Sequence, residues 1–120
     1  MIKKVAFTFY PVIDSDRARK FYGETLGLKM GLASPDGVWT EYDLPGGGCL
    51  ALFKGGKLEP SATAGGCVAF EVEDRAALVE KLKAEGVTIK TEHIPSPVCD
   101  MTIILDSEGN AIMLHELKKK

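Results

Sequence analysis

The order of apolar and polar positions along the chain predicts eight short strands and two helices. Runs of alternating β-branched and aromatic residues predict the strands, at Val5–Tyr10, Leu28–Leu32, Val38–Leu44, Cys49–Phe53, Cys67–Val72, Val87–Thr91, Val98–Leu105 and Ala111–Leu117. Apolar residues at helical spacing predict one helix between the cap candidates Asp14, Ser15 and Asp16 and a stop at Gly27, and another between Asp74 and Gly86. The resulting order is β-α-β-β-β, twice.

The two halves also share residues in the same order. Val5-Ala6-Phe7 recurs as Val68-Ala69-Phe70, Asp16-Arg17-Ala18 as Asp74-Arg75-Ala76, and Gly27-Leu28 as Gly86-Val87. The offsets are 63, 58 and 59 residues, which indicates small insertions and deletions between two copies of one unit. We therefore predict a single domain, residues 1–120, built from modules of about 1–60 and 61–120.

Composition and charge narrow the classes of function. The chain has 120 residues, of which 45% are hydrophobic, and a formal net charge of −2. This apolar content excludes a disordered chain, and the absence of a basic excess argues against a nucleic-acid partner. We expect no membrane span, since no apolar stretch is long enough, and no signal peptide. Three scattered cysteines do not form a disulfide framework and favour the cytoplasm. The basic end, residues 118–120, is expected to be a solvated tail.

Two stretches resemble the vicinal oxygen chelate superfamily, which includes glyoxalase I, bleomycin resistance proteins, fosfomycin-modifying enzymes and extradiol dioxygenases. The first is Asp16-Arg-Ala-Arg-Lys-Phe-Tyr-Gly-Glu-Thr-Leu-Gly-Leu28, and the second is Leu105-Asp-Ser-Glu-Gly-Asn-Ala-Ile-Met-Leu-His-Glu116, in which Ser107 replaces the usual proline. The resemblance implies an α+β glyoxalase/bleomycin-resistance fold, in which two βαβββ modules form an eight-stranded curved mixed sheet with helices on the convex side. It also implies a ligand on the concave side and a homodimer.

In metal-dependent members, four His, Glu or Gln side chains on the first, fourth, fifth and eighth strands hold a divalent ion. The resemblance places these positions at Phe7, at Cys49 or Ala51, at Cys67 and at Met113. None is a histidine or an oxygen ligand, and phenylalanine cannot bind a metal at all. We therefore expect no metal and no cofactor.

Alternation within the strands predicts the residues of the concave face. If the aliphatic faces of the fifth and eighth strands meet the helices, the opposite faces form the concave surface of the sheet. This surface then presents Phe7 and Phe9 from the first strand together with Cys67, Glu71, Met113 and His115. Trp39 lies on the polar-aromatic face of the third strand. An apolar surface with a few polar groups is typical of a small-molecule site. Aromatic and methionine side chains favour a planar or bulky organic ligand.

Three functions remain open. The first is metal-free sequestration of an apolar or aromatic ligand, as in bleomycin resistance proteins. The second is a glyoxalase-like lyase or a dioxygenase whose metal is bound by non-standard ligands such as Cys67 and His115, with Cys49 a further soft ligand. The third is a metal-free enzyme that uses His115 or Glu71 as a general base. Each of these residues also has a purely structural interpretation. Cys67 is then a small buried apolar side chain, His115 and Glu71 are solvated residues at strand ends, and Trp39 belongs to an exposed strand face. The remaining residues would pack in the core or in a dimer interface: Phe7, Phe9 and Met113.

Overall fold

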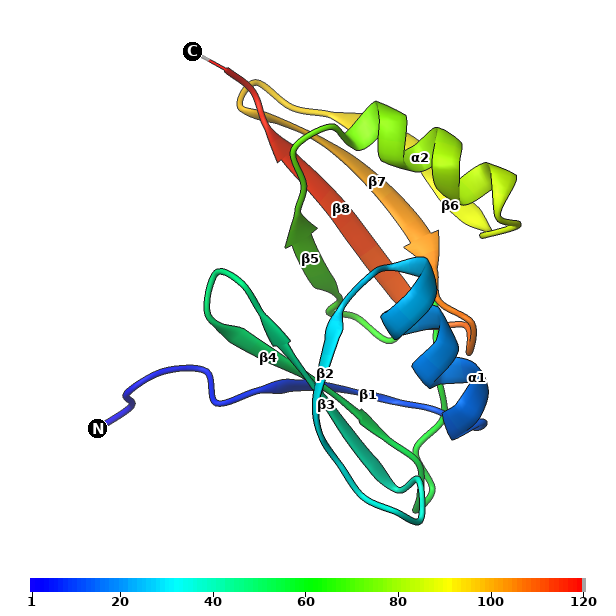
Figure 1. Cartoon of the computed structure of the whole chain (residues 1–120). Helices are drawn as coiled ribbons and strands as arrows, with labels where there is room; N and C mark the ends of the chain where they lie inside the picture. Colours follow the sequence, from blue (N-terminus) through cyan, green and yellow to red (C-terminus); the bar gives the residue numbers. More distant parts are fainter. Residues whose placement is uncertain (120) are drawn as a thin grey trace. The chain divides into compact units, whose positions relative to one another are not determined.

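The computed structural model describes residues 1–119, which contain eight strands, two α-helices and one π-helical turn (Figure 1). The strands are β1 (Thr8–Pro11), β2 (Lys29–Ala33), β3 (Trp39–Leu44), β4 (Gly48–Phe53), β5 (Val68–Glu71), β6 (Ile89–Pro95), β7 (Cys99–Leu105) and β8 (Ala111–Leu117). The helices are α1 (Ser15–Lys20), the π-turn η1 (Phe21–Thr25) that continues it, and α2 (Arg75–Ala84). At the C-terminus Lys118 and Lys119 are exposed, and residue 120 lies outside the described residues.

The strands form two four-stranded mixed sheets, one in each half of the chain. The orders are β1-β4-β3-β2 and β5-β8-β7-β6, and in each sheet the first strand pairs in parallel with the last. The chain accordingly divides into two compact units, residues 1–60 and the remainder. The predicted α+β class and the two βαβββ modules are confirmed, with the eight strands hydrogen-bonded as one sheet per module.

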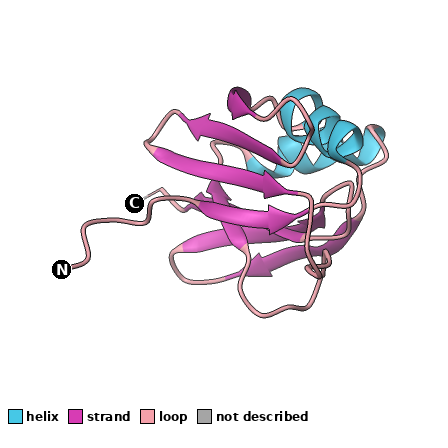
Figure 2. Cartoon of the chain, turned by 90° about the horizontal axis from the view of Figure 1, so that it is seen from below, coloured by secondary structure: helices cyan, strands magenta, loops and turns pink. Residues whose placement is uncertain are grey.

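The first strand begins three residues later than predicted. Its ladder with β4 starts at the pair Thr8–Leu50 and ends at Pro11–Phe53, while the first seven residues form a loop (Figure 2). Pro11 is tolerated because β1 is an edge strand and the proline is its last residue.

The ladders also correct the register of the repeat. The parallel ladder of each unit begins at the first residue of its first strand, Thr8 in β1 and Val68 in β5, and these two residues are 60 positions apart. The helix caps are related by the same offset, because Asp14, not Asp16, corresponds to Asp74. The sequence matches at offsets of 63 and 58 were therefore misaligned by three and two residues.

The first helix ends in a π-turn that the sequence pattern did not predict. The Asp14 carboxylate accepts a hydrogen bond from the Arg17 amide at 3.0 Å, which caps α1, and the Leu26 amide bonds to the Phe21 carbonyl five residues back. Apolar spacing at three and four residues is compatible with either helix type, so only the backbone reveals the wider turn. Gly27 stops the helix with a φ of 73°, as expected.

Each helix covers one face of its own sheet. In the first unit, Tyr22 packs on Tyr42 with ring centroids 6.0 Å apart, above the buried Leu50 and Leu52. In the second, α2 packs on β6, β7 and β8, and the buried aliphatic residues include Val79, Leu82, Ile104, Ile112 and Leu114. The apolar alternation predicted for β8 is confirmed, with Ile112 and Leu114 on the helix side.

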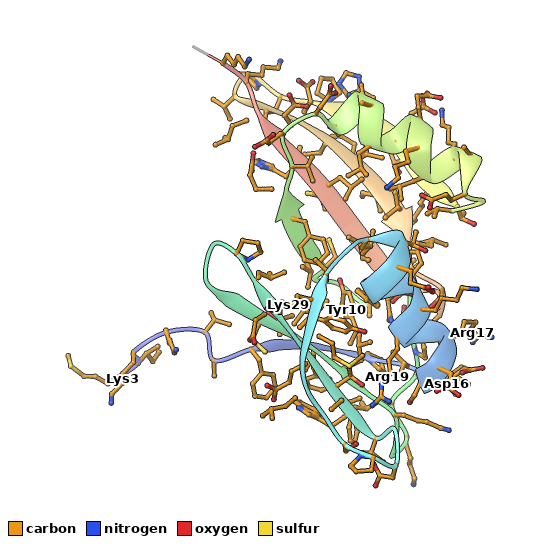
Figure 3. All side chains as sticks on the ribbon, in the orientation of Figure 1. Lys3, Tyr10, Asp16, Arg17, Arg19 and Lys29 are labelled. Atoms are coloured by element: carbon orange, nitrogen blue, oxygen red, sulfur yellow. The ribbon has the colours of Figure 1, made fainter. Side chains whose placement is uncertain are left out.

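The same arginine–threonine contact fastens helix to sheet in both units. Arg19, which is labelled on α1 in Figure 3, donates from Nε to the Thr40 hydroxyl at 2.8 Å, and Arg75 Nη1 donates to the Thr102 hydroxyl at 2.6 Å. Both threonines are buried, on the second position of β3 and the fourth position of β7. Because the arginines stand at different places in their helices, sequence comparison of the halves did not reveal this repeat.

Candidate ligand-binding faces

The sheet face of the first unit that points away from α1 carries an aromatic cluster, defined as Phe7, Phe9, Trp39 and Phe53. Trp39 lies opposite Phe53 across β3 and β4. The Phe7 and Trp39 rings meet edge to face with centroids 5.3 Å apart, and Phe9 and Phe53 do so at 6.1 Å. Phe9 and Phe53 lie 6.4 Å and 6.1 Å from Trp39, so the indole is the centre of the cluster.

The cluster is open to solvent, although it is apolar. Phe7 and Phe9 are 45% and 41% exposed, and Trp39 and Phe53 are partly exposed. Rings at these distances and angles stabilise one another, which holds them in place without burying them. A fixed and exposed aromatic surface is suited to stacking a flat organic molecule.

A carboxylate fixes the orientation of the indole. Trp39 Nε1 donates to Glu41 Oε2 at 2.8 Å, and Glu41 lies on the same face of β3 two residues along. Burial raises the pKa of the Cys49 thiol, and the nearby charges of Glu41 and Asp43 raise it further. This face therefore combines apolar rings with negative charge, and Cys49 is not an activated thiolate.

The corresponding face of the second unit is built around the ladder between β5 and β8. Ala69 lies beside Met113 and Glu71 beside His115, as alternation predicted. On the other side of β8, Ile103 lies opposite Met113 and Met101 opposite His115. Methionine and isoleucine therefore surround the single imidazole of this face.

Glu71 and His115 form a hydrogen-bonded dyad. His115 Nδ1 and Glu71 Oε1 are 2.5 Å apart, and Glu71 Oε2 accepts the Leu117 amide at 3.0 Å. The hydrogen bond from His115, followed by that from Leu117, lowers the pKa of the Glu71 carboxyl. Both carboxylate oxygens are thus engaged, and the imidazole is held at one nitrogen.

Cys67 stands apart from this dyad. It is exposed, with a free thiol, in a hollow of about 250 Å³ lined by the loop before β5 and by Lys90, Ile103 and Ala111. No hydrogen bond joins Cys67 to His115 in the part of the chain that the structure describes. The pairing of these two residues that a non-standard metal site would need is not seen.

The residues that the family resemblance assigns to the metal-ligand positions do not fit a divalent ion. Since Ala51 pairs with Phe9 as Met113 pairs with Ala69, the register selects Ala51 over Cys49 as the counterpart of Met113. Phe7, Ala51, Cys67 and Met113 supply no imidazole and no oxygen donor. Within residues 1–119, no three His, Cys, Asp or Glu side chains gather closely enough to hold a metal.

Several neighbours of the predicted site residues were missed at the level of sequence. Phe53 shares the face of Cys49 and Ala51 on β4, so applying alternation to that strand would have found it. Met101 and Ile103 could be found only from the pairing of β7 with β8. The structure brings Phe7, Phe9 and Trp39 together in one unit and Glu71, Met113 and His115 together in the other; their role in binding a ligand stays a prediction.

These two βαβββ units, each with an open sheet face, define a class of duplicated α+β proteins. The sequence profile of the Glyoxalase/Bleomycin resistance protein/Dioxygenase superfamily matches residues 4–114. The chain belongs to this superfamily, as its sequence motifs predicted. No curated protein sequence matches the chain significantly.

Solved structures with the same fold include proteins of different described functions. TnmS3, described as an antibiotic binding protein from Streptomyces sp. CB03234, is 24% identical with a TM-score of 0.81, covering 98% of both chains. A glyoxalase/dioxygenase from Nostoc punctiforme is 21% identical with a TM-score of 0.80, covering 98% of this chain and 92% of that one. The fosfomycin resistance protein FosX from Mesorhizobium loti is 19% identical with a TM-score of 0.71, covering 97% and 93%. At these identities the likeness shows the fold alone.

None of the described helices is long and apolar enough to cross a membrane.

Proposed function

We propose that this chain is a small-molecule binding protein of the bleomycin-resistance type, which holds an apolar or aromatic ligand without a metal and returns it unchanged. The observation that carries the proposal is the aromatic cluster. The family resemblance assigns the first ligand position of metal-dependent relatives to Phe7, the first member of the cluster, and the Phe7 ring packs against that of Trp39 with centroids 5.3 Å apart. A position used for coordination elsewhere in the family is thus part of an apolar surface.

The geometry of the cluster supports a planar ligand. Phe7 and Phe9 expose nearly half of their surface, and their partners hold them at tilted or edge-on angles. A flat molecule that covers these rings removes apolar area from water at about 25 cal/mol per Å². The description of TnmS3 as an antibiotic binding protein agrees with this function for a chain of the same fold.

The experiment compares anthracenemethanol, a planar aromatic alcohol, with its fully hydrogenated counterpart, which has the same carbon skeleton and no flat ring. Calorimetric titration is expected to show tighter binding of the planar compound. Phe9→Leu should weaken that binding about threefold to tenfold, the value of one aromatic contact. Leu32→Ala, which changes an exposed apolar residue on β2 of the same unit, should leave it unchanged. Equal affinities for the two compounds would contradict the proposal.

A metal-free enzyme is the second candidate, because the hydrogen bond between His115 and Glu71 orients an imidazole as a general base would be oriented. Chromatographic recovery of the bound compound separates the two functions. A product that forms with the native protein and is absent with His115→Phe would favour the enzyme, and quantitative recovery of the starting compound favours sequestration.

A homodimer and a cytoplasmic location are part of the same proposal. The homodimer is supported by the family resemblance and by the exposed apolar rings, which a second copy could cover in part. Sedimentation velocity of the purified protein tests it, with a single dimeric species expected and a monomer contradicting it.

A further inference from the structure

The dyad of Glu71 and His115 holds an imidazole so that one ring nitrogen is used and the other is available. Glu71 and His115 are direct neighbours across the parallel ladder of β5 and β8. Because Glu71 also accepts the Leu117 amide, both oxygens of its carboxylate are hydrogen-bonded, which orients the group toward His115. The His115 side chain is 27% exposed, so the ring is partly shielded yet accessible.

The state of the carboxyl group fixes the position of the proton on the ring. The pKa of Glu71 lies below its usual value, so at neutral pH the group is ionised and only accepts hydrogen bonds. The short contact therefore requires a proton on Nδ1 of His115. In the neutral imidazole this leaves Nε2 as an acceptor, and among residues 1–119 no group donates to it.

The surroundings of the dyad select the charge of what can bind there. The Glu71 carboxylate itself lies directly beside the ring, and a hollow of about 550 Å³ that Glu71 lines, but His115 does not, contains three further carboxylates, Glu73, Asp74 and Glu116, and one ammonium group, Lys119. Negative charge of this density disfavours an anionic ligand. Met101 and Met113, the neighbours of His115 on the same face, favour contact with an aromatic ring.

We infer that Nε2 of His115 is the binding site for the hydroxyl group of a neutral phenolic ligand, whose ring lies against Met101 and Met113. A phenol supplies the single donor that this nitrogen lacks and brings no negative charge beside the Glu71 carboxylate. An alkyl ether of the same ring cannot donate, and a carboxylate is both without a proton and repelled. The inference rests on the proposed function, since it gives the class of an organic ligand.

Calorimetry with para-cyanophenol and its methyl ether, para-methoxybenzonitrile, tests the inference at neutral pH, where both compounds are mainly uncharged. The native protein is expected to bind the phenol about threefold to tenfold more tightly, the value of one hydrogen bond. His115→Phe should abolish this preference, because it keeps a flat ring and removes the acceptor. Glu71→Gln should reduce the preference, since the loss of the ionised carboxylate makes Nε2 a weaker acceptor.

The other histidine of the chain provides a matched control. His93 also pairs with a carboxylate, Asp100, at 2.7 Å, on β6 and β7 of the same unit. His93→Phe should therefore leave the preference for the phenol intact. Equal affinities for phenol and ether in the native protein would overturn the inference, as would a preference that survives in His115→Phe or disappears in His93→Phe. These outcomes leave the test with anthracenemethanol unaffected, so failure of the inference is distinguishable from failure of the proposed function.

Discussion

Replacing Thr102 by valine should destabilise the protein, because it removes the arginine–threonine hydrogen bond of the second unit. The Thr102 side chain is fully buried, its hydroxyl accepts from Arg75 Nη1 at 2.6 Å, and it donates to the Glu92 carbonyl at 2.7 Å. Valine has the same shape as threonine but can neither accept nor donate a hydrogen bond through its side chain. Arg75 Nη1 would keep only the longer contact of 3.3 Å to the Glu92 carbonyl, and Nε of the same arginine is buried and already has no partner among residues 1–119.

The magnitude follows from the number of bonds lost. A buried polar group left without a partner costs about 1–3 kcal/mol, and hydrogen bonds to charged groups lie at the upper end. We therefore expect Thr102→Val to lower the free energy of unfolding by about 2 kcal/mol. Thr40→Val should cost about 1 kcal/mol, because Thr40 makes one such bond and Arg19 keeps the Ser34 carbonyl at 3.2 Å.

Urea denaturation at neutral pH measures these differences, and Thr8→Val serves as the control, since Thr8 is exposed at the start of β1. Its substitution should change the free energy of unfolding by less than about 0.5 kcal/mol. A double-mutant cycle with Arg75→Met should show that most of the effect of Thr102→Val depends on the arginine. If Thr102→Val lowers the free energy of unfolding no more than Thr8→Val does, the reasoning is refuted.

Three further predictions concern charge, backbone and metal. The stabilisation by ionised Glu71 is fully present above the ordinary pKa of this carboxyl, 4.5, and is lost as the pH falls through its lower pKa in the folded protein. The difference in free energy of unfolding between the native protein and Glu71→Gln should therefore shrink below pH 4.5 in acid denaturation. A difference that stays constant with pH would contradict the pairing of Glu71 with His115. Gly86→Ala should cost about 1 kcal/mol, because φ is 82° although space for a Cβ exists, whereas Gly46→Ala, with equal space and no positive φ, should cost less in the same urea assay. Thermal unfolding should give the same Tm with a chelator and with excess zinc, and a Tm raised by zinc would show a metal site.

The facing of side chains could be predicted from the sequence because it depends only on alternation within a strand. The bounds of β8 agree with the prediction residue for residue, and Met113 and His115 lie on the face expected for them. The start of β1 could not be predicted, because it depends on where β4 offers a partner. Val5 belongs to an apolar run and yet is 76% exposed, in the loop before the strand.

The partners of the candidate site residues depend on pairing between strands far apart in the sequence. Alternation placed Glu71 and His115 on matching faces, but only the parallel register of β5 and β8 makes them neighbours. In the same way Trp39 was expected on an exposed strand face, and its contacts with Phe7 and Phe53 follow from the order β1-β4-β3. A single sequence contains neither register nor strand order.

Native mass spectrometry of the protein titrated with anthracenemethanol tests the central claim most directly, because one spectrum reports the ligand, the metal content and the chemical state of the bound molecule. We predict a complex whose mass is that of the protein plus the intact compound. A complex that includes a divalent ion, or that carries the compound with an altered mass, would contradict metal-free sequestration.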